Sequence, residues 1–316
     1  MFRFGIIGAG SIANKFCEAV RLLEDIQVAA VASKDRERAR IFAENNGIAA
    51  YYDSYEEMLA RQDIDAVYIA TTINFHYENM MLCLKYNKPI LCEKCFALTK
   101  TEAETVFEAA KEKKLFVMEA MWSRFFPAMN KAKEWIEEGR IGTVKMANYS
   151  TGIRADSDHH IFNPDLAGGV LYDISVYAIE ICSYLINQPL KQVEAKFYYA
   201  GTGVDSSDYI MLEFSEAIAI LQCTALAKVP TSAFFYGTKG YISLPIAEHA
   251  AACYLYDDHR EIERFEYPFE NGFQFEILET VNCIRNGKTE SLIMPHVATI
   301  QCMEVFEECL KRQDVR

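Results

Sequence analysis

Short apolar segments alternate with helical patterns through residues 2–118, and this alternation limits what the chain can fold into. Strands are expected at Phe2–Ile7, Val28–Ala32, Ala66–Thr71, Ile90–Cys92 and Leu115–Met118. Helices are expected at Ser11–Leu23, Asp35–Asn46, Tyr77–Tyr86 and from the capping-box pattern Thr99-x-x-Glu102 to Lys114. Strands and helices that alternate at this spacing form right-handed βαβ units. The sequence therefore predicts a doubly wound α/β domain whose parallel sheet is covered on both faces.

The pattern changes after Glu119, where longer strand candidates joined by short turns dominate. Strands are expected at Val144–Ser150, Val193–Tyr199, Tyr209–Phe214, Ala217–Leu226, Ala233–Phe235, Tyr241–Leu244 and Cys253–Tyr256. Helices are expected at Pro127–Glu138, at the glycine-led segment Gly168–Leu185 and at about Thr299–Arg312. This pattern predicts a second α/β domain with a large, mainly antiparallel open sheet and a helix on one face. We expect the domains to comprise residues 1–119 and 120–316.

The first βα turn reads Gly8-Ala9-Gly10-Ser11-Ile12-Ala13, which is the pattern G-x-G-x-x-A. The motif alone is weak, but here it follows a strand and opens a helix, which is its expected context. Gly8 permits the tight turn, and Gly10 lets a pyrophosphate approach the backbone. Unpaired N–H groups at the helix N-terminus then favour the anion. The alternative is a plain glycine-rich turn. Because the motif stands between a strand and a helix, a dinucleotide-binding domain is the stronger prediction.

The end of the second strand indicates which dinucleotide binds. An NAD site carries an acid there for the ribose 2′-hydroxyl, whereas this chain has Ser33 and Lys34, with Arg38 following. A hydroxyl and cations suit a 2′-phosphate, which favours NADP over NAD. Asp35 complicates this interpretation, although its position is more natural for a cap of the next helix. The alternative is that Lys34 and Arg38 are ordinary solvated helix charges.

Composition excludes several partners and gives no sign of export. The chain has 316 residues and a net charge of -13, which argues against nucleic acid or an anionic membrane as a partner. No apolar run approaches the roughly 20 residues of a spanning helix, and the N-terminus lacks signal-peptide anatomy. The ten cysteines are scattered, mostly through apolar segments, as in reduced proteins. We therefore expect a cytoplasmic protein.

Lys94 is the first candidate for chemistry, because it ends a parallel strand at the sheet edge where ligands of open α/β sheets bind. The alternative is a surface lysine. The neighbouring Cys92-x-x-Cys95 spacing is a weak dithiol signal without a second ligand pair. The loop with Asp156, Asp158, His159 and His160 is more often a solvated rim than a metal site, so no metal is expected.

The chain resembles the glucose–fructose oxidoreductase and inositol dehydrogenase family (Gfo/Idh/MocA). The motifs that carry this resemblance lie at Phe4–Ala13, Leu91–Lys94, Gly168–Tyr177 and Gly237–Gly240. Met118–Pro127 is similar to the branch of dimeric dihydrodiol dehydrogenases and NADP-linked pentose dehydrogenases. Cys95 departs from the family's usual Pro, and His160 stands where Arg is expected. Many members have His where this chain has Tyr177, but the dihydrodiol branch has Tyr.

The resemblance implies a Rossmann domain, a C-terminal open-sheet domain, and catalytic roles for Lys94, Asp173 and Tyr177. It also implies contacts to the cofactor from Thr71, Thr72, Asn74, His76, Glu93, Trp122 and Arg124. These add to the contacts expected from Gly8, Gly10, Ser11, Ile12, Ala13, Ser33, Lys34, Arg38 and Lys94. Among these, the pattern alone also allows His76 to be a helix cap and Trp122 to be core.

The implied activity is hydride transfer between a nicotinamide and a CH–OH or C=O group of a sugar, polyol or trans-dihydrodiol. Whether Tyr177 or Lys94 is the base stays open, since neither side chain is ordinarily deprotonated at neutral pH. The rival hypothesis is a non-catalytic NADP(H) sensor. We expect a polyhydroxylated small molecule as substrate and a homodimer formed through the C-terminal sheet, which would cover its open face.

Overall fold

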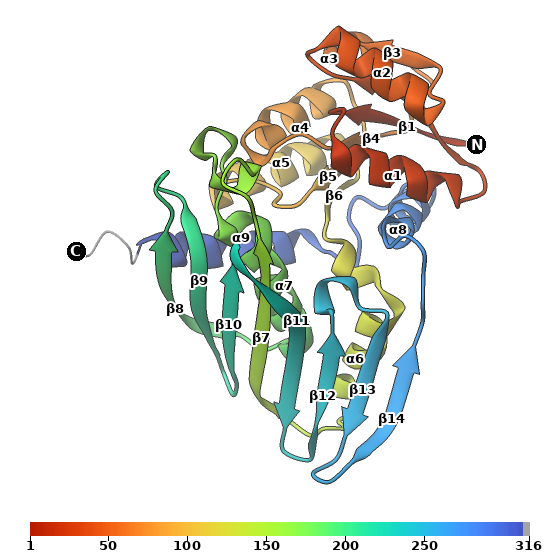
Figure 1. Ribbon diagram of the computed structural model, residues 1–316. Helices are drawn as coiled ribbons and strands as arrows, with labels where there is room; N and C mark the ends of the chain where they lie inside the picture. The colour runs from red at the N-terminus through yellow and green to blue at the C-terminus, as the bar shows by residue number, and fades with distance from the viewer. Residues whose placement is uncertain (312–316) are drawn as a thin grey trace. The chain divides into compact units, whose positions relative to one another are not determined.

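The computed structural model describes residues 1–311 and divides into two compact units. Met1–Trp122 and Asn271–Ile300 form the first unit, whereas Ser123–Glu270 and the described residues 301–311 form the second. Segment 271–300, from near the end of the chain, therefore belongs with the N-terminal unit (Figure 1). No pattern in the sequence indicates this return.

The first unit is built on a six-stranded parallel sheet in the order β3-β2-β1-β4-β5-β6. Its strands are β1 (Phe2–Ile7), β2 (Ile26–Ala32), β3 (Ala50–Tyr52), β4 (Ala66–Ile69), β5 (Ile90–Glu93) and β6 (Val117–Ala120). Its helices are α1 (Ser11–Arg21), α2 (Arg36–Asn46), α3 (Tyr55–Leu59), α4 (His76–Lys85), α5 (Lys100–Lys113) and α8 (Phe273–Arg285). This strand order is that of a dinucleotide-binding Rossmann fold, which confirms the predicted fold class.

Two predicted helix caps explain why α2 and α5 begin where they do. The Asp35 side chain accepts a hydrogen bond from the Arg38 backbone N–H at 3.1 Å. Thr99 Oγ1 likewise accepts from the Glu102 N–H at 3.2 Å. Each cap satisfies one of the N–H groups that have no partner within the helix. The cap at Asp35 is the one that the sequence suggests, so this acid is engaged at the start of α2.

The second unit contains an eight-stranded sheet in the order β14-β13-β12-β11-β7-β10-β9-β8. All neighbouring pairs are antiparallel except β7 with β10, which confirms a mainly antiparallel sheet. The strands are β7 (Val144–Arg154), β8 (Leu190–Tyr199), β9 (Asp205–Phe214), β10 (Ile218–Thr224), β11 (Leu226–Gly237), β12 (Gly240–Pro245), β13 (Ala252–Tyr256) and β14 (Glu261–Glu266). The helices α6 (Pro127–Glu137) and α7 (Val176–Ile186) cover one face, and α9 spans His296–Lys311 (Figure 1).

The structure corrects some predicted bounds in this unit. The expected strand Ala217–Leu226 is divided between β10 and β11, which are antiparallel to different neighbours. The edge strand β14 is rich in Glu and Arg and carries little strand signal, although charged edges protect sheets from unwanted pairing. The final helix begins three residues earlier than the expected Thr299, and its predicted end at Arg312 lies outside the described residues.

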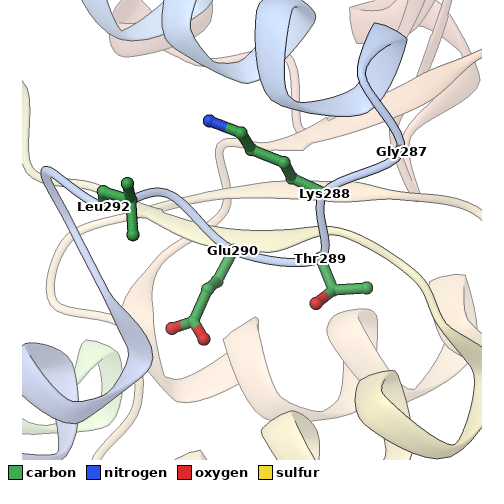
Figure 2. A pocket seen from close by; sticks show the side chains of 5 residues that line it. All are labelled: Gly287, Lys288, Thr289, Glu290 and Leu292. Atoms are coloured by element: carbon green, nitrogen blue, oxygen red, sulfur yellow. The ribbon is translucent and has the colours of Figure 1, made fainter.

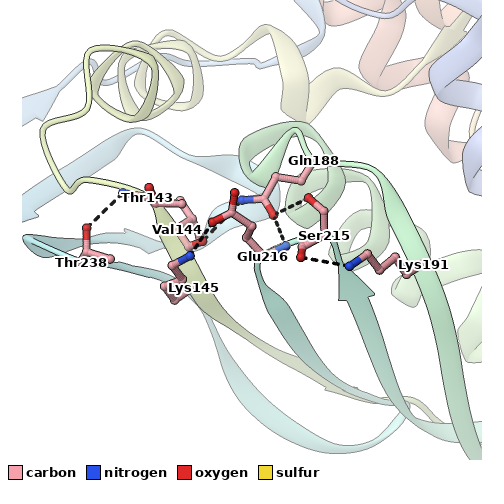
Figure 3. A network of polar contacts seen from close by, with 8 residues as sticks. All are labelled: Thr143, Val144, Lys145, Gln188, Lys191, Ser215, Glu216 and Thr238. Atoms are coloured by element: carbon pink, nitrogen blue, oxygen red, sulfur yellow. Dashed lines mark hydrogen bonds and ion pairs between the residues drawn. The ribbon is translucent and has the colours of Figure 1, made fainter.

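A polar network fixes the C-terminal end of α7 to the strands beneath it (Figure 3). Gln188 Oε1 accepts from the Glu216 backbone N–H at 2.9 Å, and its Nε2 donates to the Val144 carbonyl at 3.4 Å. Lys145 pairs with Glu216 at 2.6 Å, and Lys191 donates to the Ser215 carbonyl at 3.2 Å. The helix is therefore held at its last turn by the start of β7 and by the β9–β10 turn.

Among residues 1–311, one stretch, Pro164–Ile186, is long and apolar enough to cross a membrane, which the sequence did not lead us to expect. However, 72% of its apolar window is buried inside the protein, as in the core helix of a globular fold. The stretch is also not one regular α-helix. Residues Leu171–Ser175 form a π-helical turn, which corrects the predicted regular helix over 168–185.

Candidate active site

The glycine turn after β1 is shaped so that only glycine fits at its first position. Gly8 has φ +105°, and a Cβ atom there would lie 2.7 Å from the Ala70 carbonyl oxygen. Gly10 is the N-cap of α1 and provides no side-chain cap, and no acid lies in the first helical turn. The helix thus begins without a capping side chain for the backbone N–H groups of Ser11, Ile12 and Ala13. This end of α1 can accept an anion such as a pyrophosphate.

A basic side chain from the first turn of α2 lies over this glycine turn. Arg38 Nε donates to the Ala9 carbonyl at 2.9 Å, and its Nη2 lies 3.8 Å from the position of a Cβ on Gly10. Lys34 Nζ lies 4.7 Å from the centre of the Phe75 ring. Ser33 is buried beside them and its Oγ accepts from the Asp35 N–H at 3.4 Å. The arrangement presents cations and a hydroxyl beside the turn, whereas the Asp35 carboxylate is occupied as a helix cap.

His76 connects the loops that follow β4 and β5. Its ring nitrogens lie 2.9 Å from the Thr71 carbonyl and 2.8 Å from the Cys95 carbonyl. Burial is the largest cause that lowers the pKa of this imidazole, and the Lys94 cation is a smaller one. The alternative of a cap on α4 is wrong, because the ring bridges two loops and Phe75 occupies the N-cap position.

The remaining polar residues after β4 bond to one another. Thr72 Oγ1 donates to Asn74 Oδ1 at 2.7 Å, and Asn79 Nδ2 donates to Thr71 Oγ1 at 3.1 Å. Thr71, Thr72 and Asn74 are half-buried and follow β4, which places them at the carboxyl edge of the parallel sheet. This is the edge at which open α/β sheets bind ligands.

Glu93 belongs to a buried polar cluster that the sequence did not reveal. It accepts a hydrogen bond from the hydroxyl of Tyr68, whose ring stacks on Phe16 with 3.9 Å between ring centres. Glu276 of α8 is fully buried, and neither of its carboxylate oxygens has a hydrogen-bond partner among residues 1–311. Burial, followed by the charge of Glu93, raises the pKa of Glu276 well above its ordinary value. An acid on the apolar side of the helical pattern Phe273–Arg285 is the one signal that could have indicated it.

Lys94 follows β5 directly and is half-buried. The peptide bond that joins it to Cys95 is cis.

Burial raises the pKa of the Cys92 thiol well above its usual range, so this sulfur is not a ready nucleophile or metal ligand. Within residues 1–311, no group of three His, Cys, Asp or Glu side chains lies close enough to hold a metal ion.

Asp173 and Tyr177 lie in the second unit, where the π-helical turn Leu171–Ser175 leads into α7. Both side chains are half-buried, and His160 Nε2 lies 3.5 Å from Asp173 Oδ2. A π turn inside a helix is a feature that is frequent at functional sites. The structure thus brings His160, the residue that departs from the family pattern, against one member of the predicted catalytic set.

Arg124 is buried and forms an ion pair with Glu180 of α7, with its Nε 3.0 Å from Glu180 Oε2. Its guanidinium also lies 4.7 Å from the centre of the Tyr184 ring. The sequence did not indicate Glu180, although an acid in the apolar run of α7 signals a buried partner. Trp122, just before it in the chain, is half-buried and packs at 5.0 Å against Phe273.

A hollow of about 350 Å³ on the first unit lies away from these residues (Figure 2). It is lined by Gly287, Lys288, Thr289, Glu290 and Leu292, and Figure 2 shows Lys288 and Glu290 pointing to opposite sides of the segment. The Thr289 carbonyl accepts from the N–H of Val117, the first residue of β6. The hollow is therefore at the amino edge of the parallel sheet, opposite to the glycine turn.

The strand order, the uncapped glycine turn and the basic side chain at the start of α2 define a dinucleotide-binding protein of the Rossmann class. Comparison with known families agrees. Residues 2–121 match a family described as "Oxidoreductase family, NAD-binding Rossmann fold", and residues 129–243 match the "GFO/IDH/MocA C-terminal domain". The chain belongs to the GFO/IDH/MocA oxidoreductase family.

Similarity to individual relatives extends over almost the whole chain. It is 31% identical to a trans-1,2-dihydrobenzene-1,2-diol dehydrogenase of Xenopus tropicalis, with 99% of this chain and 98% of the relative covered. It is 32% identical to a D-xylose 1-dehydrogenase (NADP(+)) of Hypocrea jecorina, with 99% and 92% covered. A solved aldose-aldose oxidoreductase from Caulobacter crescentus is 22% identical with a TM-score of 0.90 and coverage of 98% and 96%, which shows the same fold.

These findings confirm the predicted family, its fold, the oxidoreductase class and a nicotinamide dinucleotide as the cofactor. The roles of the individual site residues stay predictions, because the structure places them without testing what they bind.

Proposed function

We propose that the protein is an NADP-dependent dehydrogenase or reductase that acts on a CH–OH or C=O group of a sugar, polyol or trans-dihydrodiol. One observation carries the preference for NADP. Lys34 follows β2 and Arg38 lies in the first turn of α2, with its guanidinium over the glycine turn, and Asp35 is engaged as the cap of α2. A 2′-phosphate there would meet cations rather than a repelling carboxylate.

The residues at the turn fit the cofactor. Gly8 and Gly10 leave room that a Cβ would fill or narrow, and the start of α1 offers N–H groups to a pyrophosphate. Bound NADP supplies the acceptor or donor of the hydride. In our proposal Thr71, Thr72, Asn74, His76, Glu93, Trp122 and Arg124 complete the cofactor site.

We assign the proton chemistry to Lys94, Asp173 and Tyr177. Lys94 and Tyr177 bind the substrate hydroxyl, and one of them removes its proton when the alcohol is oxidised. Asp173 accepts hydrogen bonds from the polar array and orients it. The support for this set is its match to the family motifs, together with the half-buried position of each side chain, which limits access of water.

A spectrophotometric screen tests the function. Pentoses, hexoses, inositols and dihydrodiols are offered with NADP or NAD, and NADPH or NADH absorbance is followed. We expect turnover with one of these classes and a lower KM for NADP than for NAD. Tight NADPH binding without turnover on any class would instead support a non-catalytic sensor, and a preference for NAD would overturn the cofactor assignment.

A matched pair of tyrosine variants tests the catalytic set. Tyr177→Phe should lower kcat by about a hundredfold if this hydroxyl is the base, with NADPH affinity unchanged. The control is Tyr184→Phe on the same helix, whose hydroxyl bonds Asn130 at 3.0 Å and has no proposed role in the reaction. Near-normal turnover of Tyr177→Phe would remove Tyr177 from the mechanism and leave Lys94 as the base.

We further propose a homodimer formed through the outer face of the C-terminal sheet. Alternate residues of the strands are buried beneath α6 and α7, and the intervening ones form a surface rich in aromatic side chains. Met146 and Ile218 are neighbours across β7 and β10 and are 43% and 42% exposed. Ring contacts continue through Phe234, Tyr236, Tyr241 and Tyr256. A patch of this kind suits a second copy of the same sheet.

Light scattering during gel filtration tests the dimer. Met146→Arg and Ile218→Arg should produce monomers at low micromolar concentration. The control is Leu292→Arg, which places the same charge at an apolar residue of the first unit that is 82% exposed. A wild-type monomer, or a dimer that survives both sheet substitutions, would contradict this interface.

Location and further partners complete the proposal. All ten cysteines lie buried as thiols, which suits a reducing compartment, and we place the protein in the cytoplasm. The substrate partner is a small polyhydroxylated molecule. The net charge of -13 disfavours nucleic acid and anionic membrane surfaces as partners.

A further inference from the structure

Two aspartates of β9 hold the π-helical turn from which Asp173 projects. Asp205 Oδ2 accepts from the backbone N–H of Leu171, the first residue of the turn, at 2.6 Å. Asp208 Oδ2 accepts from the hydroxyl of Ser175, the last residue of the turn, at 2.6 Å. The five-residue turn is thus bracketed at both ends by one strand.

Gly169 shows how closely the first aspartate approaches. Its φ is +129°, and a Cβ atom there would lie 2.3 Å from Asp205 Oδ1. Only glycine allows this carboxyl to reach the start of the turn, because any side chain would collide with it and would also be strained at this φ. The second glycine of the Gly168-Gly169 pair is therefore explained by Asp205.

The charge of Asp205 also acts on Asp208 and contributes to the raised pKa of that carboxyl. Two neighbouring carboxyl groups with little access to water disfavour each other's ionisation, so the pair favours holding a proton. Asp208 is 1% exposed, and its Oδ1 has no hydrogen-bond partner within the described chain. A neutral carboxyl tolerates that environment far better than a carboxylate does, so the proton belongs to Asp208.

The surroundings of Asp208 keep the proton in place. Burial and then the charge of Asp205 raise the pKa of Asp208 well above its ordinary value. The other groups that face it are Ser175 from the turn, Cys223 of β10, which is its register partner, and Phe197 of β8 on the other side. Burial also raises the pKa of the Cys223 thiol, so this neighbour stays neutral.

We propose that Asp205 and Asp208 act as a positioning pair that fixes the π-helical turn and thereby orients Asp173 and Tyr177. The functional half of this inference rests on the catalytic roles proposed above. Neither aspartate touches substrate, and both act through the backbone and Ser175. An asparagine at this position can still accept the hydrogen bond from Ser175 and should preserve the arrangement, whereas removing the side chain should release the turn.

Three variants separate these possibilities. Asp208→Asn keeps an oxygen that can accept from the Ser175 hydroxyl, and Asp208→Ala removes it. Ser207→Ala is the matched control, because Ser207 lies between the two aspartates but bonds Thr224 Oγ1 at 2.6 Å instead of the turn. Hydrogen–deuterium exchange of the peptide covering 168–177 should rise in Asp208→Ala about tenfold or more and stay near wild type in the other two.

The pH dependence of unfolding gives a readout that needs no substrate. A raised native pKa means that the folded state keeps a proton which the unfolded chain loses above about pH 4. Wild-type stability should therefore fall, as a lower urea midpoint, when the pH rises from about 4 through the raised pKa of Asp208. This part of the pH dependence should disappear in Asp208→Asn and persist in Ser207→Ala.

Turnover then tests the link to catalysis. Asp208→Ala should lower kcat about tenfold or more at unchanged NADPH affinity, and Asp208→Asn should restore most of it. Equal exchange or equal kcat in the Asn and Ala variants would overturn the positioning pair, and a wild-type urea profile parallel to that of Asp208→Asn would overturn the protonation of Asp208. If the screen finds no substrate, the proposed function fails, while exchange and unfolding still decide whether the pair holds the turn.

Discussion

Replacing the buried acid Glu276 by methionine should stabilise the protein, and more so as the pH rises. The carboxyl is fully buried with no hydrogen-bond partner among residues 1–311, which costs about 1–3 kcal/mol in a folded protein. Methionine has a similar volume and can occupy the same space without a polar group. At low pH, where the acid is protonated in both states, we expect a gain of about 1–3 kcal/mol.

The gain should grow above about pH 4.3, where glutamate ionises in the unfolded chain. The native pKa of Glu276 is raised by burial and by Glu93, so the wild-type native state keeps its proton over this range. The wild type then loses about 1.4 kcal/mol of stability per pH unit until the raised pKa is passed, and Glu276→Met does not. The difference between the two proteins therefore widens steadily with pH.

Urea unfolding at half-unit intervals between pH 4 and 8 measures this difference. The control is Glu279→Gln, one turn along α8, whose carboxylate accepts from Ser291 Oγ at 2.6 Å. Removing that partnered charge should cost about 1 kcal/mol rather than stabilise. A Glu276→Met protein that is less stable than wild type at every pH would show that the acid is satisfied in solution and would refute the reasoning.

Three further substitutions have defined outcomes. Arg38→Ala should raise the KM for NADP about tenfold or more and leave that for NAD nearly unchanged, because only the 2′-phosphate loses a charged partner; steady-state kinetics with both cofactors measure this. Gly8→Ala should abolish NADPH binding as measured by fluorescence titration, since the new Cβ would lie 2.7 Å from the Ala70 carbonyl oxygen. Glu180→Gln should destabilise by about 3–5 kcal/mol in urea, because it leaves the buried Arg124 charge unpaired; a loss under 1 kcal/mol would contradict burial of the pair.

The first unit could be predicted because its signals are local. The strand β1, the glycine turn and the cap at Asp35 each lie within a few residues, and the structure has them where the pattern puts them. The short elements β3 and α3 were missed, since three and five residues carry too little periodicity. The strand β9 was expected to begin at Tyr209 rather than Asp205, because Asp and Ser are depleted in strands.

The polar clusters behind the candidate site could not be predicted, because they join residues that are distant in sequence. Glu276 meets Tyr68 and Glu93 only because segment 271–300 packs with the first unit. The bond from Leu171 to Asp205 spans 34 residues. A π turn depends on the backbone hydrogen-bond pattern, which side-chain periodicity does not encode.

Both clusters place a carboxyl with a raised pKa next to an element that carries predicted catalytic residues. Glu276 lies near Glu93, the residue before Lys94, and Asp208 holds the turn that carries Asp173. An ionised acid in either place would need a buried cation and would add a field at the reacting groups. A neutral carboxyl can order its neighbours without that field, at a cost in stability that rises with pH. The two clusters should therefore respond oppositely to apolar substitution: Glu276, without a hydrogen-bond partner among residues 1–311, should gain stability, and Asp208, which holds Ser175, should lose order in the turn.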